Sequence, residues 1–196
     1  MKRLFDIVIS LLALLFFSPI FVVATILIKI TLGSPIFYIQ KRPGLNCKLF
    51  KLIKFRTMKK SELNYIDSEN DLKRITKLGK FLRNTSIDEL PELINVFFGS
   101  MSIVGPRPLL EEYLGFYSNE QMRRHTVKPG ITGWAQINGR NKLSWDQRFI
   151  LDNWYVDNHN LFIDIKIILT TVIHIIKRKN INESSQITKS KFKGNN

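Results

Sequence analysis

The 196-residue sequence contains little cysteine, little histidine and few acidic residues. Its single cysteine, Cys47, excludes an internal disulfide and fits a reducing compartment. The three histidines, His125, His159 and His174, lie far apart and have no cysteine neighbours, so no zinc-site spacing is present. Only 16 acidic residues accompany 30 basic ones, and the net charge is +14. This excess favours an anionic partner, which could be nucleic acid, anionic lipid or a phosphorylated substrate.

Charge is absent altogether from residues 7–28. As a helix, these residues would extend roughly 33 Å, about the thickness of the hydrocarbon core of a bilayer. Lys2 and Arg3 resemble the start of a signal peptide, but the run is longer than a usual signal sequence. No clear small-residue cleavage site follows it either. The run is therefore interpreted as a membrane segment that is not cleaved.

Ser18 and Pro19 lie at the middle of this run and predict a break in the helix. Proline removes a backbone donor and leaves the carbonyl of Leu15 without its helical partner, which the Ser18 hydroxyl can replace. Basic residues flank both ends of the run, with no acidic residue after it until Glu62, so both flanks are expected in the cytoplasm. A re-entrant helical hairpin satisfies both features, and a kinked spanning helix is the alternative.

The remainder predicts a helix-rich α/β fold with a small β-hairpin. Ser86 and Glu89 fit a capping box that would start a helix, and Gly99 would end it. Strands are expected at residues 36–39 and 49–55 around a Pro43-Gly44 turn. Further helices are expected at residues 78–83, 111–125, 145–158 and 161–176, and a loop at 129–133.

The adjacent acids Asp88 and Glu89 have two interpretations. At the start of a helix, their charges would complement the helix dipole and the free amides. Alternatively, with Arg83 before them and Arg107 after the helix, the carboxylates could coordinate a divalent cation or attack a phosphorus atom. The residues alone leave both interpretations open.

Several basic residues are candidates for phosphate or nucleotide binding. Arg107 lies between two prolines that restrict its backbone, and its planar fork suits a bidentate phosphate contact. Lys54 and Arg56 would share one face of a strand. Arg140 follows a glycine-containing segment that has no Walker A pattern. A rigid turn, a solvated edge strand and an ordinary loop, respectively, are the structural alternatives.

Seven runs in order resemble the monotopic phosphoglycosyl transferases, a family of bacterial sugar transferases. The resemblance extends from Lys2 to about Arg178. The runs are residues 2–6 (KRLFD), 18–19 (SP), 40–44 (QKRPG), 54–58 (KFRTM), 86–93 (SIDELPEL), 101–108 (MSIVGPRP) and 128–140 (KPGITGWAQINGR). Any one run would be weak evidence, whereas the ordered set is specific.

The resemblance implies an enzyme at the cytoplasmic face of the bacterial inner membrane. It implies a re-entrant membrane helix at residues 1–32, a catalytic domain at 33–180 and a basic tail at 181–196. Asp88 would be the nucleophile of a ping-pong reaction, with magnesium near it and Glu89 completing the dyad. Arg107 would hold a substrate phosphate, and Arg83 is taken as a second phosphate ligand. The substrates would be a UDP-sugar and undecaprenyl phosphate, with membrane lipid as a further partner; oligomeric state is not predicted.

The donor sugar is expected to be N,N'-diacetylbacillosamine. Residues 106–114 and the short basic tail most resemble family members that transfer this sugar phosphate in protein N-glycosylation. Galactose, glucose or N-acetylated hexosamine 1-phosphate, for capsule or O-antigen, is the alternative. A non-catalytic basic protein that binds anionic lipid is a distant alternative. Nucleic acid is not expected as a partner, because no nucleic-acid motif with interleaved aromatics accompanies the charge.

Overall fold

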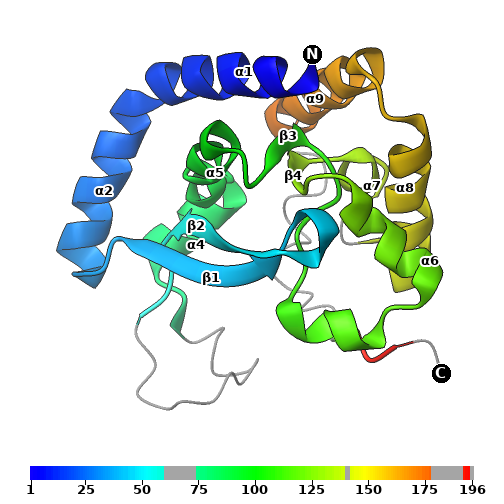
Figure 1. The fold of residues 1–196 in the computed structure, drawn as a ribbon. Coiled ribbons are helices and arrows are strands. Elements are labelled where there is room, and N and C mark those ends of the chain that lie inside the picture. The colour runs from blue at the N-terminus through cyan, green and yellow to red at the C-terminus, as the bar shows by residue number, and fades with distance from the viewer. Residues whose placement is uncertain (60–73, 140–141, 178–191, 195–196) are drawn as a thin grey trace.

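The computed structural model describes residues 1–59, 74–139, 142–177 and 192–194. It is a helix-rich α/β structure with two small sheets, as expected (Figure 1). In chain order its helices and strands are α1 (Lys2–Phe16), α2 (Ser18–Leu32), β1 (Phe37–Pro43), η1 (Leu45–Cys47), β2 (Leu49–Phe55), α4 (Lys77–Asn84), η2 (Ile87–Glu89), α5 (Glu92–Phe98), β3 (Ser102–Val104), η3 (Glu111–Phe116), α6 (Asn119–Met122), η4 (Arg123–Thr126), β4 (Gly130–Thr132), α7 (Trp134–Ile137), α8 (Trp145–Asn158) and α9 (Leu161–Ile176).

The N-terminal apolar run forms two helices that meet at a sharp bend (Figure 1). Helices α1 and α2 enclose a bend of 60° at Phe17. The Ser18 hydroxyl donates to the carbonyl of Leu15 at 2.7 Å, which confirms the predicted local partner. Within the described residues no single helix is long and apolar enough to cross a bilayer, whereas this bent pair passes that test jointly, by length and composition alone.

The first turns of α1 are anchored to the rest of the protein by polar contacts. Lys2 contacts Asp164 of α9 at 2.5 Å, and Arg3 donates to the last carbonyls of α5 at 2.7 Å. The buried carboxylate of Asp6 accepts from the amide of Ile103 and the hydroxyl of Ser102, both at 3.0 Å. Helix α1 therefore turns polar groups towards the domain.

The opposite face of α1 is apolar and exposed. Leu4, Leu12, Leu15 and Phe16 are all more than half exposed, while Ser10 is fully buried. A helix in water normally has the reverse distribution, with apolar side chains inside and polar ones outside. The arrangement suits a helix whose outer face contacts an apolar solvent.

The β-hairpin forms as predicted, although its first strand continues to Pro43 beyond the expected end at residue 39, whereas the second sheet was not foreseen. Strands β1 and β2 pair antiparallel, with Tyr38 opposite Lys54 and Gln40 opposite Leu52. Strand β4, which lies in the segment expected to be a loop at 129–133, pairs parallel with β3. Three-residue strands carry too little periodicity to be recognised from sequence.

Two of the helix predictions are wrong in detail. Ser86 has a left-handed backbone (φ 57°) and its side chain makes no capping bond. A single helix from Ser86 would need the backbone donor that Pro91 lacks, so the chain forms the short η2 and starts α5 only at Glu92. The helix expected at 111–125 is divided into η3, α6 and η4, with an extended residue at Tyr117 between the first two.

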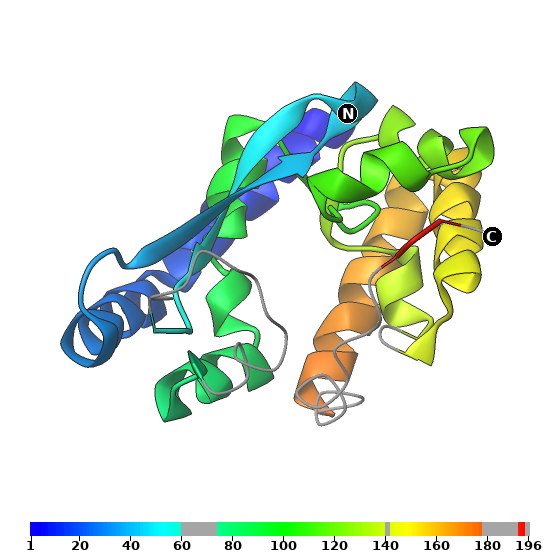
Figure 2. The same ribbon diagram turned by 90° about the horizontal axis from the view of Figure 1, so that it is seen from below.

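Helices α4, α8 and α9 agree with the predictions, and α8 begins with a capping box formed by Ser144 and Gln147. Seen from below, α1, α2, α4 and the β-hairpin form one group of elements, and α6 to α9 form another (Figure 2). Val96, Met101, Val104, Tyr155 and Ile167 belong to the core that joins the two groups. The expected domain boundaries at 32/33 and 180/181 are not tested by this arrangement and stay predictions.

Candidate active site

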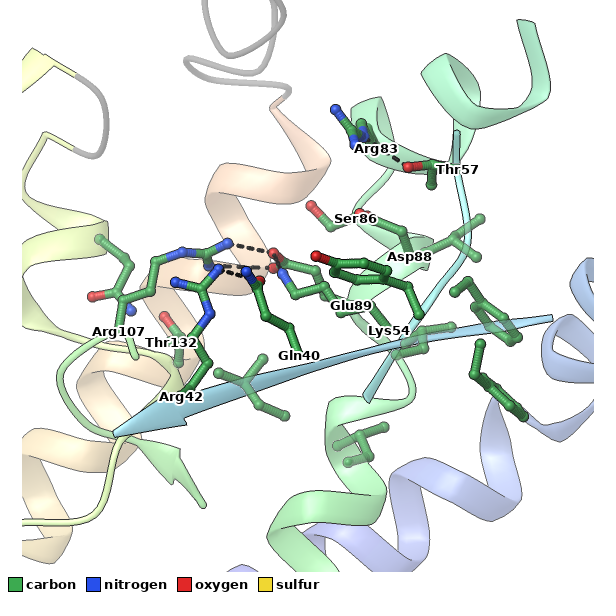
Figure 3. Close-up of a pocket in the computed structure, with 18 of the residues that line it drawn as sticks. Gln40, Arg42, Lys54, Thr57, Arg83, Ser86, Asp88, Glu89, Arg107 and Thr132 are labelled. Carbon is green, nitrogen blue, oxygen red and sulfur yellow. Dashed lines mark hydrogen bonds and ion pairs between the residues drawn. The ribbon is translucent and has the colours of Figure 1, made fainter. Parts of the chain in front are cut away.

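An open cleft of about 2010 Å³ lies between the two groups of elements. Strands β1 and β2, the η2 turn and the loop at Arg107 form its charged part (Figure 3). Apolar side chains from α1 and α9, including Ile9, Ala13, Ile168 and Val172, line another part. The cleft thus offers both a charged wall and an apolar wall to a ligand.

Asp88 lies in the cleft on the η2 turn and is half-buried. Within the described part of the chain, no hydrogen bond or ion pair reaches its carboxylate. Burial, and then the negative charge of Glu89, raise the pKa of Asp88 to about 6. Arg83, Lys54 and Arg107 partly oppose this shift. Asp88 is therefore more basic than an ordinary aspartate, yet it is still mostly ionised at neutral pH.

Glu89 is in the opposite situation, because two cations hold it. Arg107 donates to Glu89 Oε1 at 2.5 Å, and Lys54 donates to the same oxygen at 2.7 Å (Figure 3). Burial alone would raise the pKa of Glu89, but the charges and hydrogen bonds of Arg107 and Lys54 hold it well below its usual range. Glu89 therefore stays ionised and fixes the two cations at the cleft wall.

Glu92, the first residue of α5, was not predicted as a site residue but belongs to the same network of charged side chains. It is 2% exposed, and its Oε1 lies 3.0 Å from the Lys54 ammonium. Burial and the charge of Glu89 raise the pKa of Glu92 to about 7. Lys54 is thus shared between two carboxylates. Glu92 lies within the 86–93 run, which was the available sequence signal. The sequence does not show its contact with Lys54, so Glu92 could not be distinguished from an ordinary helix residue.

The loop that carries Arg107 is fixed by contacts on its side away from the cleft. Arg124 donates to the Arg107 carbonyl at 2.7 Å and is itself paired with the buried Asp152 at 2.8 Å. A side chain at Gly105 would collide with the Lys128 carbonyl, 2.2 Å from an added Cβ, so glycine is required where this loop meets the next one. These contacts direct the Arg107 guanidinium into the cleft.

The other predicted basic residues are distributed differently. Arg83 lines the cleft and donates to the Thr57 hydroxyl at 2.9 Å. Arg56 also lines the cleft, but it donates to the carbonyls of Leu32 and Gly33, so it closes the end of α2. Arg140 lies outside the described residues.

Two polar residues of β1 that were not predicted face the same cleft. Arg42 donates to Gln40 at 2.7 Å, and both side chains lie beside Arg107 in Figure 3. Both residues belong to the 40–44 run of the sequence, which was the signal that could have identified them. Their distance from Asp88 along the chain concealed the association.

The site can accommodate magnesium only in a particular way. The described residues contain no group of three or more His, Cys, Asp or Glu side chains that could hold a metal ion. Magnesium is commonly held by one or two carboxylates together with substrate phosphates and water. Asp88, an unpaired carboxylate facing the cleft, fits that type of site, whereas Glu89 is already engaged by two cations.

Known proteins with similar sequences extend over nearly the whole chain. An "Uncharacterized sugar transferase EpsL" of Bacillus subtilis is 47% identical over 99% of this chain and 96% of its own. The exopolysaccharide production protein ExoY of Rhizobium meliloti is 38% identical over 87% of this chain and 83% of its own.

A longer relative carries a more specific name. The UDP-glucose:undecaprenyl-phosphate glucose-1-phosphate transferase of Escherichia coli is 42% identical over 88% of this chain but only 39% of its own length. The sequence profile described as bacterial sugar transferase matches residues 1–178. The chain therefore belongs to the bacterial sugar transferase family, a family of enzymes.

Proposed function

We propose that this enzyme transfers a sugar 1-phosphate from a UDP-sugar to undecaprenyl phosphate and releases UMP. The observation that carries the proposal is the contrast at η2, where an unpaired carboxylate lies beside one that two cations hold. The name of the E. coli relative supports the reaction class. Assembly of a surface glycoconjugate is the corresponding role, and the name of the ExoY relative supports exopolysaccharide as one product class.

Asp88 is the proposed nucleophile. One of its carboxylate oxygens attacks the sugar-bearing phosphorus, and the bond from that phosphorus to the bridging oxygen breaks, so UMP leaves with the bridging oxygen. An oxygen of the acceptor phosphate then attacks the same phosphorus and displaces the Asp88 carboxylate. Neither step changes an oxidation state or requires a net proton. A raised pKa makes Asp88 a better nucleophile than an ordinary aspartate while leaving it ionised at neutral pH.

Arg107 and Lys54 would neutralise the phosphate that approaches Asp88. The second Arg107 nitrogen lies 3.5 Å from Glu89, so this arm of the fork is only weakly engaged and can reach a phosphate oxygen. Arg83 would act from another direction, since Figure 3 shows it above Asp88, beside Thr57, whereas Arg107 lies to the left. Glu89 would serve mainly to orient Arg107 and Lys54, because both cations donate to its Oε1.

Magnesium is proposed to bind at Asp88 together with substrate phosphate oxygens. When bound, it would supply charge that offsets the repulsion between a carboxylate and a diphosphate. Activity should disappear on thorough chelation and return with added Mg²⁺. Full activity in a chelator would refute the requirement.

For the donor, UDP-N,N'-diacetylbacillosamine is proposed because of residues 106–114, and UDP-glucose is the second candidate because of the E. coli relative. The purified protein should be incubated with undecaprenyl phosphate and a panel of UDP-sugars, and UMP release measured. The diacetamido donor should give the highest kcat/KM. A clear preference for UDP-glucose, UDP-galactose or a UDP-N-acetylhexosamine would replace it, and no release from any donor would overturn the proposed function.

The α1–α2 pair is proposed to enter the cytoplasmic leaflet of the inner membrane and return. Lys2 contacts Asp164 in the domain, and Arg56 holds the end of α2, so both ends of the pair lie on the domain's side. The exposed apolar face of α1 would contact lipid.

Labelling of single cysteines can test this topology. A cysteine inserted after Met1, in a Cys47→Ser background, avoids disturbing the Lys2 contact. An impermeant thiol reagent should label it only after spheroplasts are permeabilised. A Lys48→Cys control in the exposed hairpin turn should behave identically. Labelling of the inserted cysteine alone in intact spheroplasts would establish a spanning helix instead.

A further inference from the structure

Arg42 faces the cleft without a carboxylate partner, unlike Arg107 in the cleft and Arg124 behind it. Arg107 pairs with Glu89 and Arg124 pairs with Asp152. Arg42 donates to the neutral amide oxygen of Gln40 at 2.7 Å, and its buried Nε has no hydrogen-bond partner. Among the residues that the structure describes, no carboxylate lies within ion-pair distance of its guanidinium. An arginine that is partly buried without a counter-ion is costly, so the binding of an anion at this position would be favourable.

The position of Arg42 indicates where that anion would lie. Tyr38, Gln40 and Arg42 alternate along β1 and therefore share one face of the hairpin, and Tyr38 pairs with Lys54 of the charged network. In Figure 3 the Arg42 head group lies between Gln40 and Arg107. Arg42 and Arg107 line the same end of the cleft, and burial together with the positive charge of Arg107 lowers the pKa of Arg42. An anion between them would relieve both the burial and the repulsion.

We infer that Arg42 and Gln40 form a subsite for the nucleoside-side phosphate of the UDP-sugar. This inference rests on the proposed function. Asp88 and Arg107 engage the sugar-bearing phosphate, and a diphosphate carries its second phosphate immediately beside the first. The arginine fork supplies two donors to that phosphate, and Gln40 keeps the fork oriented without neutralising it. Holding the leaving phosphate would also stabilise the charge that UMP acquires as it departs.

The Arg42→Gln variant tests the subsite, with UMP as the probe because it carries only the nucleoside-side phosphate. The full-length protein in detergent should bind UMP about 10- to 100-fold more weakly than the wild type, as expected for the loss of a charge-assisted contact. The UDP-sugar concentration that gives the half-maximal rate of the single, donor-only release of UMP should rise similarly. Binding of uridine, which has no phosphate, should not change.

Two further variants keep the test decisive. Gln40→Glu retains Arg42 but places a carboxylate on it, so UMP binding should weaken although no cation is removed. This variant also replaces Arg42→Gln if the latter does not fold. Arg123→Gln removes a guanidinium that is paired with Glu120 outside the cleft, and UMP binding should be as in the wild type.

The outcomes separate the inference from the proposed function. Unchanged UMP binding in Arg42→Gln and Gln40→Glu, in a wild type that transfers sugar phosphate, would overturn the subsite alone. Normal UMP binding and donor-only release with slow transfer to lipid would place Arg42 at the acceptor phosphate, and would also overturn the inference. A wild type that releases no UMP from any UDP-sugar would overturn the proposed function, and absence of UMP binding to that wild type would overturn the subsite with it.

Discussion

Two polar clusters in this protein use the same residue types for different purposes. At the N-terminus, Lys2 and Asp164 form an ion pair, the Asp6 carboxylate accepts two hydrogen bonds from neutral donors, and Asp6 and Asp164 are almost completely buried. At the cleft, two cations hold Glu89, but Asp88 beside it has no partner among the described residues. A completely paired cluster stabilises the fold. A partly buried carboxylate without a partner lowers the stability of the fold but remains free to react.

The sharpest test of this comparison is Asp88→Asn. The variant should lose UMP release by several orders of magnitude, even without acceptor, because the nucleophile is gone. Wild-type protein with donor alone should release UMP at most stoichiometrically and carry a phosphosugar on Asp88 by mass spectrometry. An adduct on another residue, or near-normal turnover of the variant, would sink the assignment.

The same variant should unfold at a higher temperature than the wild type at pH 7. Folding raises the pKa of Asp88 from 3.8 to about 6, so the native state binds this proton more tightly than the unfolded chain. Stability is therefore lost as pH rises from about 4 to about 6, and asparagine avoids this cost. The gain should shrink towards pH 4, as followed by thermal unfolding. A lower Tm at pH 7 would mean that Asp88 helps to hold the fold.

Substitution of Arg107, like that of Asp88, should affect activity more than stability. Arg107→Ala should reduce transfer by roughly 100-fold, as expected for loss of a charge-assisted phosphate contact. The thermal unfolding of this variant should change little, because the Arg107 side chain is substantially exposed, at 39%. Arg107→Lys should recover only part of the activity, since a point charge does not reproduce the planar fork. A variant that unfolds early but turns over normally would make Arg107 a structural residue.

In the N-terminal cluster the opposite result is expected. Asp164→Asn removes the charge that Lys2 and the Tyr155 hydroxyl contact, and it should cost roughly 2 kcal/mol of stability. The kcat at a temperature where the variant remains folded should stay near that of the wild type. Arg123→Gln, at a more exposed ion pair, is the matched control and should cost much less. Equal Tm values for the two variants would contradict the structural role of the cluster.

The smallest effect concerns pH. Glu89→Gln removes the negative charge that helps raise the pKa of Asp88 and frees Lys54 and Arg107 to lower it. The acid limb of kcat/KM for UMP release should therefore move to lower pH, by about one unit. Measurement between pH 4.5 and 8 would detect the shift. A shift to higher pH would show that Glu89 does not set the basicity of Asp88.

Local sequence signals predicted much of the fold. The bend at Ser18, the hairpin, α8 and α9 depend on neighbouring residues, so proline chemistry and periodicity were sufficient. The division of the 111–125 segment and the parallel β3–β4 pair depend on contacts between distant segments, and neither has a local signature.

The site was predicted as separate residues rather than as a network. Asp88, Glu89, Arg83, Arg107 and Lys54 were named from the sequence, and all of them line the cleft. The pairing of Lys54 with both Glu89 and Glu92 requires β2 to lie beside α5, which no local pattern reveals. Arg56 was grouped with Lys54 by strand alternation, but β2 ends at Phe55, and Arg56 reaches the end of α2 instead.

The length of helix α5 bears on how far from the lipid boundary the transfer reaction occurs. Its first residue, Glu92, belongs to the charged network, and its last, Phe98, is 78% exposed beside the carbonyls that Arg3 holds. Seven helical residues extend roughly 10 Å. If α1 lies in the leaflet as proposed, α5 is a rigid spacer between the lipid boundary and the reactive carboxylates. The height of a lipid's phosphate above the hydrocarbon would then select the acceptor, before any contact with its isoprenoid chain.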